Sequence, residues 1–179
     1  MGLRYKVDGI NCLYFITTTV IKHLPILTLK EVPEILISNL NFYRNKYNFL
    51  LNAYVIMPSH IHLIIWVPEI ISISNIMRDF KKFSSIQIRE KLIEKKSKYL
   101  PVLYFEGKKY QNQKFKLWMR RSDKVVIISE KILLIKMNYI HENPVRAGLV
   151  DKPELYLYSS ARNYMLDDDS IIQIDRIEI

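Results

Sequence analysis

The apolar and polar residues change spacing several times along the chain, and each change marks an element. Residues 13–20 are an aromatic and β-branched run that predicts a strand. Thr28 and Glu31 are placed to form a capping box for the helix that follows. Apolar residues at helical spacing predict this helix to be about four turns long. They are Val32, Leu36, Leu40, Tyr43 and Tyr47.

Two further strand-like runs, residues 50–57 and 60–67, are separated by only two residues, which predicts an antiparallel hairpin. A long amphipathic helix then begins at Ser72 or Ser74. Its apolar stripe consists of Ile73, Ile76, Met77, Phe80 and Phe83. The polar and basic residues 95–116 are predicted to form a loop.

The last predicted elements are a strand over residues 124–128 and a helix that Ser129 caps. This helix is expected to stop at about Glu142, because Asn143 precedes Pro144 and a residue before proline avoids the helical region. The order matches the βαββαβ pattern of an α+β, ferredoxin-like antiparallel sheet with an additional C-terminal helix. One domain, residues 1–165, is expected, with an acidic tail at 166–179.

The net charge of +9, from 27 basic and 18 acidic residues, is concentrated in the middle of the chain. Residues 78–124 contain 15 basic and five acidic side chains. This charge fits a nucleic-acid-binding surface and a merely solvated basic face equally well. The candidate phosphate contacts are Arg78, Lys81, Lys82, Arg89, Lys114, Lys116, Arg120 and Arg121. Tyr110 and Phe115 are candidates for stacking on bases, whereas Trp118 is expected in the core. The acidic tail is expected either to be disordered or to cover the basic surface.

Several classes of protein are excluded by composition. No apolar run reaches the roughly 18 residues that a membrane span requires. The single Cys12 excludes an internal disulfide framework and a multi-cysteine zinc site. The first residues do not resemble a signal peptide. A cytoplasmic protein without a membrane partner is therefore expected.

His60 and His62 are the first candidates for chemistry. Because side chains alternate along a strand, the two imidazoles share one face, roughly 6.5–7 Å apart, and can converge on one metal ion. The alternative is a pair of core histidines bonded to backbone or water.

Tyr139 and Asn143 are the second candidates, because a spacing of four places them on one helix face with Lys136. A phenol is a usable nucleophile for phosphoryl transfer. Its ordinary pKa of about 10 calls for a nearby cation or base, such as Lys136 or a metal. Two imidazoles and the Asn143 amide oxygen suit Mg²⁺ or Mn²⁺. The alternatives are a packing tyrosine and a helix-terminal asparagine.

Two motifs in this order carry a family resemblance. Residues 54–65, Tyr-Val-Ile-Met-Pro-Ser-His-Ile-His-Leu-Ile-Ile, and 138–150, Asn-Tyr-Ile-His-Glu-Asn-Pro-Val-Arg-Ala-Gly-Leu-Val, resemble the IS200-like single-tyrosine transposases. Within that family the motifs resemble those of the REP-associated tyrosine transposases. Leu117-Trp118 and Tyr158-Ser159-Ser160 extend the resemblance over nearly the whole chain.

The resemblance implies roles for individual residues. His60 and His62 match the metal ligands of the family, Tyr139 its nucleophile and Asn143 the third ligand. Such proteins cleave single-stranded DNA, often at hairpin-forming repeats, and leave a 5′-phosphotyrosine. His141 is expected to be structural and Glu142 a weaker alternative ligand. A monomer is favoured over a homodimer, and a non-catalytic nucleic-acid-binding protein is the alternative function.

Overall fold

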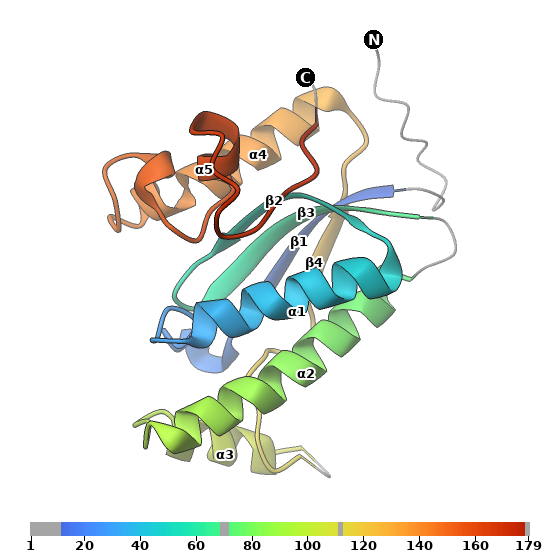
Figure 1. Cartoon of the computed structure of the whole chain (residues 1–179). Coiled ribbons are helices and arrows are strands. Elements are labelled where there is room, and N and C mark those ends of the chain that lie inside the picture. Colours follow the sequence, from blue (N-terminus) through green and yellow to red (C-terminus); the bar gives the residue numbers. More distant parts are fainter. Residues whose placement is uncertain (1–11, 69–71, 111–112, 178–179) are drawn as a thin grey trace.

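A four-stranded antiparallel sheet forms the centre of the molecule, with helices on both faces (Figure 1). The computed structural model describes residues 12–68, 72–110 and 113–177. Its elements are β1 (Cys12–Thr19), a 3-10 turn (Ile21–His23), α1 (Val32–Tyr47), β2 (Leu50–Ile56), β3 (His60–Val67), α2 (Ile73–Glu94), α3 (Leu100–Lys108), β4 (Asp123–Val126), α4 (Glu130–Arg146), a second 3-10 turn (Pro153–Leu155) and α5 (Ala161–Met165).

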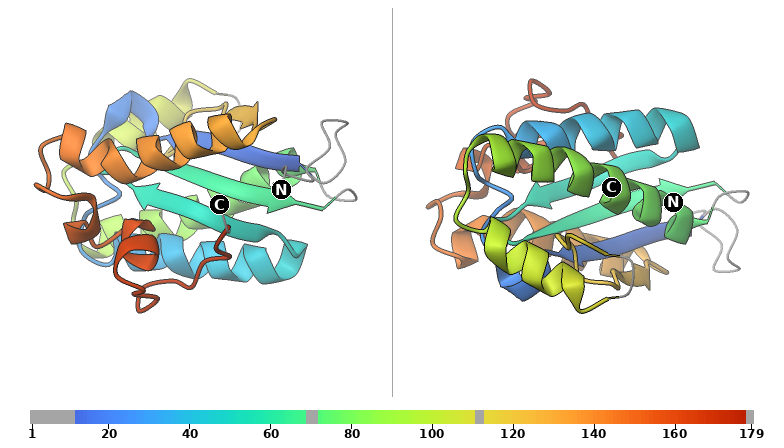
Figure 2. Two further views of the ribbon diagram at one scale, coloured as in Figure 1. Left: turned by 90° about the horizontal axis from the view of Figure 1, so that it is seen from above. Right: turned by 90° about the horizontal axis from the view of Figure 1, so that it is seen from below.

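The strand order is β2-β3-β1-β4, and every neighbouring pair is antiparallel. This order confirms the predicted ferredoxin-like α+β fold with an additional helix, α4, after the fourth strand. β2 and β3 form the predicted hairpin, in which the Met57 amide donates to the His60 carbonyl at 2.8 Å. Figure 2 shows α4 over one face of the sheet and α2 and α3 over the other.

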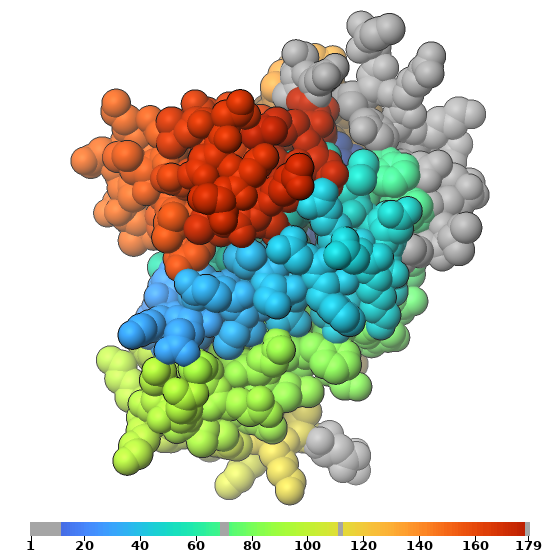
Figure 3. Space-filling view, viewed as in Figure 1, coloured from blue at the N-terminus to red at the C-terminus, as the bar shows by residue number. Residues whose placement is uncertain are grey.

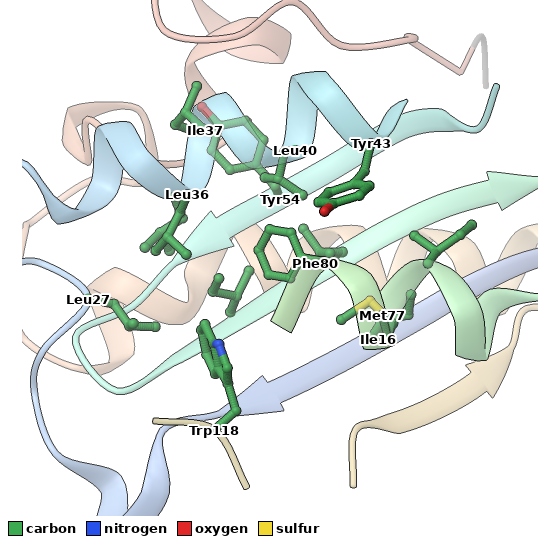
Figure 4. Close-up of a cluster of buried hydrophobic side chains, with 14 of the residues drawn as sticks. Ile16, Leu27, Leu36, Ile37, Leu40, Tyr43, Tyr54, Met77, Phe80 and Trp118 are labelled. Carbon is green, nitrogen blue, oxygen red and sulfur yellow. The ribbon is translucent and has the colours of Figure 1, made fainter. Parts of the chain in front are cut away.

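The larger core lies between the sheet and the α1–α2 layer. Ile61, Leu63 and Ile65 alternate along β3 toward this layer, where they are at most 2% exposed. Tyr43, Phe80 and Trp118 belong to the same core (Figure 4). Trp118 is 5% exposed, and its indole nitrogen donates to the Ser84 hydroxyl at 3.1 Å, so the expectation that Trp118 is a core residue is confirmed.

The second core lies on the opposite face, under α4. Phe15, Val55 and Ile64 contribute from the sheet, and Met137 and Ile140 contribute from the helix. Because β-strand side chains alternate, the residues that precede Ile64 on this face of β3 are His62 and His60. The strand period therefore delivers both imidazoles to the α4 side.

The chain after α4 covers the outer edge of β2. Tyr158 and Ser160 exchange backbone hydrogen bonds with β2, and the Asp175 amide donates to the Leu51 carbonyl at 2.8 Å. The Asp175 carboxylate accepts from the Leu51 amide and pairs with Arg44 at 2.6 Å. Figure 3 shows the C-terminal segment, in red, directly beside α1. The acidic segment is thus ordered as far as residue 177 and lies against β2, so both expectations for it are wrong.

Three local predictions are also wrong. Residues 100–108 form α3 instead of loop, and α3 packs against α2. Glu31 makes no cap at the start of α1, because its backbone is left-handed and its carboxylate pairs with Lys91 and Lys95. α4 continues through Pro144 to Arg146. Proline removes one amide donor, but near the end of a helix few hydrogen bonds remain to be lost.

Candidate active site

The two imidazoles of β3 lie side by side beneath α4. Their ring centroids are 4.7 Å apart, with an angle of 72° between the ring planes. His62 is 4% exposed, and its Nδ1 lies 2.9 Å from the hydroxyl of Thr17, the residue opposite it on β1. The Nδ1 of His60 lies 3.3 Å from the Ser59 hydroxyl. In both residues one nitrogen is held by a neighbouring hydroxyl, which fixes the ring and directs the other nitrogen elsewhere.

The Nε2 atom of His62 is buried and has no hydrogen-bond partner among the described residues. An unpartnered buried nitrogen costs about 1–3 kcal/mol. Burial, followed by the charges of His60 and Lys136, lowers the pKa of His62 to about 3. Burial likewise lowers the pKa of His60, although a hydrogen bond with the Asn143 side chain partly offsets it. Both rings are therefore neutral near pH 7, the form in which imidazole binds a metal.

α4 places Tyr139 over this pair. The phenol ring lies 5.1 Å from the His62 ring and 5.9 Å from the Phe15 ring, between centroids, edge-on to both. Tyr139 is 36% exposed, so its ring is packed at the base while solvent reaches the side chain. Asn143, one turn further along α4, reaches His60. The predicted histidine pair, tyrosine and asparagine are thus brought together on one face of the sheet.

Two cations flank the phenol. The Lys136 Nζ atom lies 4.6 Å from the centroid of the Phe15 ring and 5.9 Å from that of Tyr139. The Arg146 Cζ atom lies 5.5 Å from the Tyr139 centroid. The site therefore combines neutral nitrogen donors, a phenol and positive charge, a set that can hold a phosphate group beside a nucleophile.

The neighbours of Tyr139 in sequence have other surroundings. His141 is buried, and its Nε2 lies 3.0 Å from the Ser160 hydroxyl, which confirms the expectation that it is structural. Burial lowers its pKa to about 4. Within the described residues no three His, Cys, Asp or Glu side chains are grouped to hold a metal, so Glu142 does not join the histidine pair. A third ligand from the side chains near this pair is therefore an amide rather than a carboxylate.

A basic groove of about 1410 Å³ lies on the other face of the sheet, between α2 and the segment from residue 113 to β4. One acidic side chain, Asp123, lines this groove. The basic side chains that line it are Arg78, Lys81, Lys82, Lys116, Arg120, Arg121 and Lys124. Lys124 lies opposite Ile16 on β1, a residue of the α1–α2 core, and this places Lys124 on the α2 side of the sheet.

The predicted phosphate contacts differ in how available they are. Arg89 and Lys114 do not line the groove, whereas the other six do. The Lys81 ammonium donates to the carbonyls of Met119 and Arg120 at 2.6 and 3.2 Å. Burial, with the charges of Lys116 and Lys124, lowers its pKa to about 8. Lys81 therefore holds the 119–122 loop in place.

Lys116 is 6% exposed, and its Nζ atom lies 3.3 Å from the centroid of the Tyr110 ring. Tyr110 itself lines the groove and is 41% exposed. Lys82, Arg120 and Arg121 are exposed there. Arg78 and Lys124 are exposed as well, but Arg78 pairs with Asp79 and Lys124 donates to the Ser74 hydroxyl. Lys82, Arg120 and Arg121 are therefore the groove cations most available to a polyanion.

Three contributors were missed from sequence. Thr17 orients His62, and the cross-strand pairing of β1 and β3 is the signal that identifies it. Lys124 is recognised from the alternation of β4. Arg146 was missed because the helix was predicted to stop before Pro144; seven residues from Tyr139 is nearly two full turns, which returns a side chain to the same face.

Comparison with known proteins places the chain among the transposases. A family model described as "Transposase IS200 like" matches residues 10–143, most of the chain. The chain belongs to the IS200-like transposase family. The comparison with curated proteins gives no match.

Two solved structures are similar. The first is described as a REP-associated tyrosine transposase bound to a REP hairpin. It is 21% identical, with a TM-score of 0.65, over 98% of this chain and 92% of that one, and it has the same fold. The second, a candidate transposase from Deinococcus radiodurans R1, is 18% identical with a TM-score of 0.49, over 75% of this chain and 92% of the other. No described helix has the length and apolar character to cross a bilayer.

Proposed function

We propose that this transposase cleaves and rejoins single-stranded DNA through Tyr139, with Mg²⁺ or Mn²⁺ held by His60, His62 and Asn143. The observation that carries the proposal is the position of the Tyr139 ring, 5.1 Å from an imidazole whose buried Nε2 has no partner in the part of the chain that the structure describes. That nitrogen, neutral and fixed through Thr17, fits a metal ligand. A divalent cation bound there would offset negative charge on the phosphate.

The protein side chains act on the phosphodiester as follows. The Tyr139 oxygen attacks phosphorus, the bond to the 3′ oxygen breaks, and the 3′ oxygen leaves as a hydroxyl. The product is a 5′-phosphotyrosine. Attack by another 3′-hydroxyl reverses the step and restores the phenol. Because the ester bond is conserved in the phosphotyrosine, no nucleotide cofactor is needed.

The basic groove supports binding of the non-reacting part of the DNA. Lys82, Arg120 and Arg121 are exposed there, and each phosphate contact that they make adds nearly one unit to the salt dependence of binding. Exposed Tyr110 supports stacking on an unpaired base. A similar fold is described bound to a REP hairpin, and a hairpin is the partner that we propose here.

The experiment is a covalent-capture assay. A labelled pool of single-stranded oligonucleotides, each with a hairpin and randomised flanks, is mixed with protein and Mn²⁺ and resolved on a denaturing gel. The wild-type chain is expected to form a covalent adduct. Tyr139→Phe and His60→Ala are expected to form none, while Tyr104→Phe, on α3, keeps wild-type levels. Native gel shifts without any adduct would identify a non-catalytic binding protein instead.

We propose that the tyrosine acts in cis and that the protein works as a monomer. Support comes from the Tyr139 and His62 rings of one chain, which already lie in contact distance. Mixing Tyr139→Phe with His60→Ala tests this arrangement. A monomer acting in cis gives no adduct in the mixture, whereas a dimer with exchanged helices restores it.

A further inference from the structure

Arg146 differs from the three arginines that contact the C-terminal segment of the chain. Arg44, Arg162 and Arg176 each pair with an aspartate. Arg146 makes no ion pair or hydrogen bond with any residue that the structure describes, and its Cζ atom lies 5.5 Å from the centroid of the Tyr139 ring. Its side chain is exposed. A guanidinium without a carboxylate, beside a phenol, is free to bind an anion.

The position of Arg146 is fixed by the end of α4. The helix passes Pro144 and closes at Gly148, whose φ of 67° is left-handed. The Gly148 amide donates to the Val145 carbonyl and the Leu149 amide to the Pro144 carbonyl, both at 2.9 Å. This glycine-based closure satisfies the last carbonyls and holds the final turn in place. Helical side chains lean toward the N-terminus, so Arg146 leans back along the helix toward Tyr139.

We propose that Arg146 is a catalytic residue that binds the non-bridging oxygens of the phosphodiester attacked by Tyr139. The inference rests on the proposed function. In the step, the Tyr139 oxygen bonds to phosphorus, and the bond to the 3′ oxygen breaks with its electron pair. The 3′ oxygen takes up a proton, and the phenol proton passes to solvent. Arg146 neutralises charge on the oxygens throughout the step.

The planar fork of guanidinium suits this role better than the point charge of an ammonium. It donates two parallel hydrogen bonds to a phosphate and holds it in one orientation. Lys136, on the other side of the phenol, lies over Phe15 and is half-buried. Its charge is therefore placed to stabilise the Tyr139 phenolate rather than to bind the phosphate oxygens. The two cations therefore have different roles. Lys136 lies near the nucleophile and His62, whereas Arg146 lies on the solvent side, from which DNA approaches.

The test measures the rate of adduct formation on one oligonucleotide selected from the captured pool, at saturating DNA. Arg146→Ala is expected to slow the reaction by about 100- to 1000-fold, the usual loss when one donor to a developing charge is removed. Binding affinity, measured in the Tyr139→Phe background, is expected to change only a few-fold. Arg146→Lys is expected to recover part of the rate. Lys131→Ala, which removes an exposed cation from the same helix, is the matched control and keeps the rate.

A second substrate separates phosphate binding from a structural role. It carries a neutral methylphosphonate at the cleaved linkage. With this substrate the penalty of Arg146→Ala is expected to fall below about tenfold, because the charge that the guanidinium neutralises is absent. An equal penalty on both substrates, or an unchanged rate on the natural one, overturns the inference. If the wild-type chain forms no adduct with the natural phosphodiester, the proposed function is refuted instead. If Arg146→Ala fails to fold, Arg146→Gln, which keeps most of the stem, gives the same comparison.

Discussion

The buried Nε2 of His62, which has no partner within residues 12–68, 72–110 and 113–177, predicts that the site lowers the stability of the metal-free protein. We consider the double variant Thr17→Val, His62→Phe, which replaces a hydrogen-bonded pair by apolar groups of similar shape. The Phe15 ring, stacked on His62 with centroids 5.4 Å apart, can pack against the new ring in the same way. The double variant removes the orphaned Nε2 without leaving the Thr17 hydroxyl unpaired.

The magnitude follows from two terms. Loss of the Thr17–His62 hydrogen bond costs about 0.5–1.5 kcal/mol, and removal of the buried unsatisfied nitrogen returns about 1–3 kcal/mol. The metal-free double variant is therefore expected to be about 1 kcal/mol more stable than the wild type, a rise in Tm of roughly 2–4 °C. Thr17→Val alone has the opposite sign, because it leaves both imidazole nitrogens without a partner.

The assay is urea unfolding, followed by circular dichroism, in EDTA and in Mn²⁺. At a Mn²⁺ concentration ten times its Kd, ligand binding should stabilise the wild type by about 1.4 kcal/mol and the double variant not at all. The difference in unfolding free energy between the double variant and the wild type should therefore be smaller in Mn²⁺ than in EDTA, or change sign. A double variant that is less stable than the wild type in EDTA, or equal Mn²⁺ shifts in both proteins, would refute the reasoning.

Three further predictions concern the groove, the C-terminal segment and the second core. Lys82→Met should lower the salt slope of DNA binding by nearly one unit. Lys81→Met should weaken binding without changing the slope, because the Lys81 ammonium is engaged by loop carbonyls. Titrations over a salt series distinguish the two variants. Asp175→Ala should cost about 1–3 kcal/mol in urea unfolding, since a β2 amide loses its side-chain acceptor and Arg44 loses its ion pair; an unchanged midpoint contradicts this. The unfolded state takes up a proton on His141 before the native state does, so the contribution of His141 to stability should fall by up to about 3 kcal/mol as the pH drops from 6.5 to 4. His60 and His62 add losses of the same sign, so His141→Gln should lose less stability than the wild type over this range but should still lose some; parallel acid titrations of the two proteins decide it.

The sheet was predictable because its strands carry strong local signals. The two-residue gap before His60 indicates a hairpin, and the strand period indicates that His60 and His62 share a face. Those signals are contained in a few adjacent residues. The distance from Tyr139 to this face could not be predicted in this way, since it depends on how α4 packs on the second core.

The errors arise where tertiary contacts outweigh local preference. Pro144 was read as a stop, yet it is buried in the last turn of α4, and the glycine closure after it keeps the helix intact. α3 was predicted as loop from its polar flanks, although Leu103 packs fully into the core. Lys81 has the sequence appearance of a surface cation. Its burial depends on the 119–122 loop, which lies nearly forty residues further along the chain.

The C-terminal cover of β2 restricts how molecules of this protein can associate. A strand from another copy cannot extend the sheet through β2 unless it first displaces the backbone hydrogen bonds made by Tyr158, Ser160 and Asp175. Growth by strand addition is left to β4, which pairs only with β1 among the described strands. Two molecules meeting there would bring together two groove walls of the same sign, and a polyanion between them would be needed to relieve the repulsion.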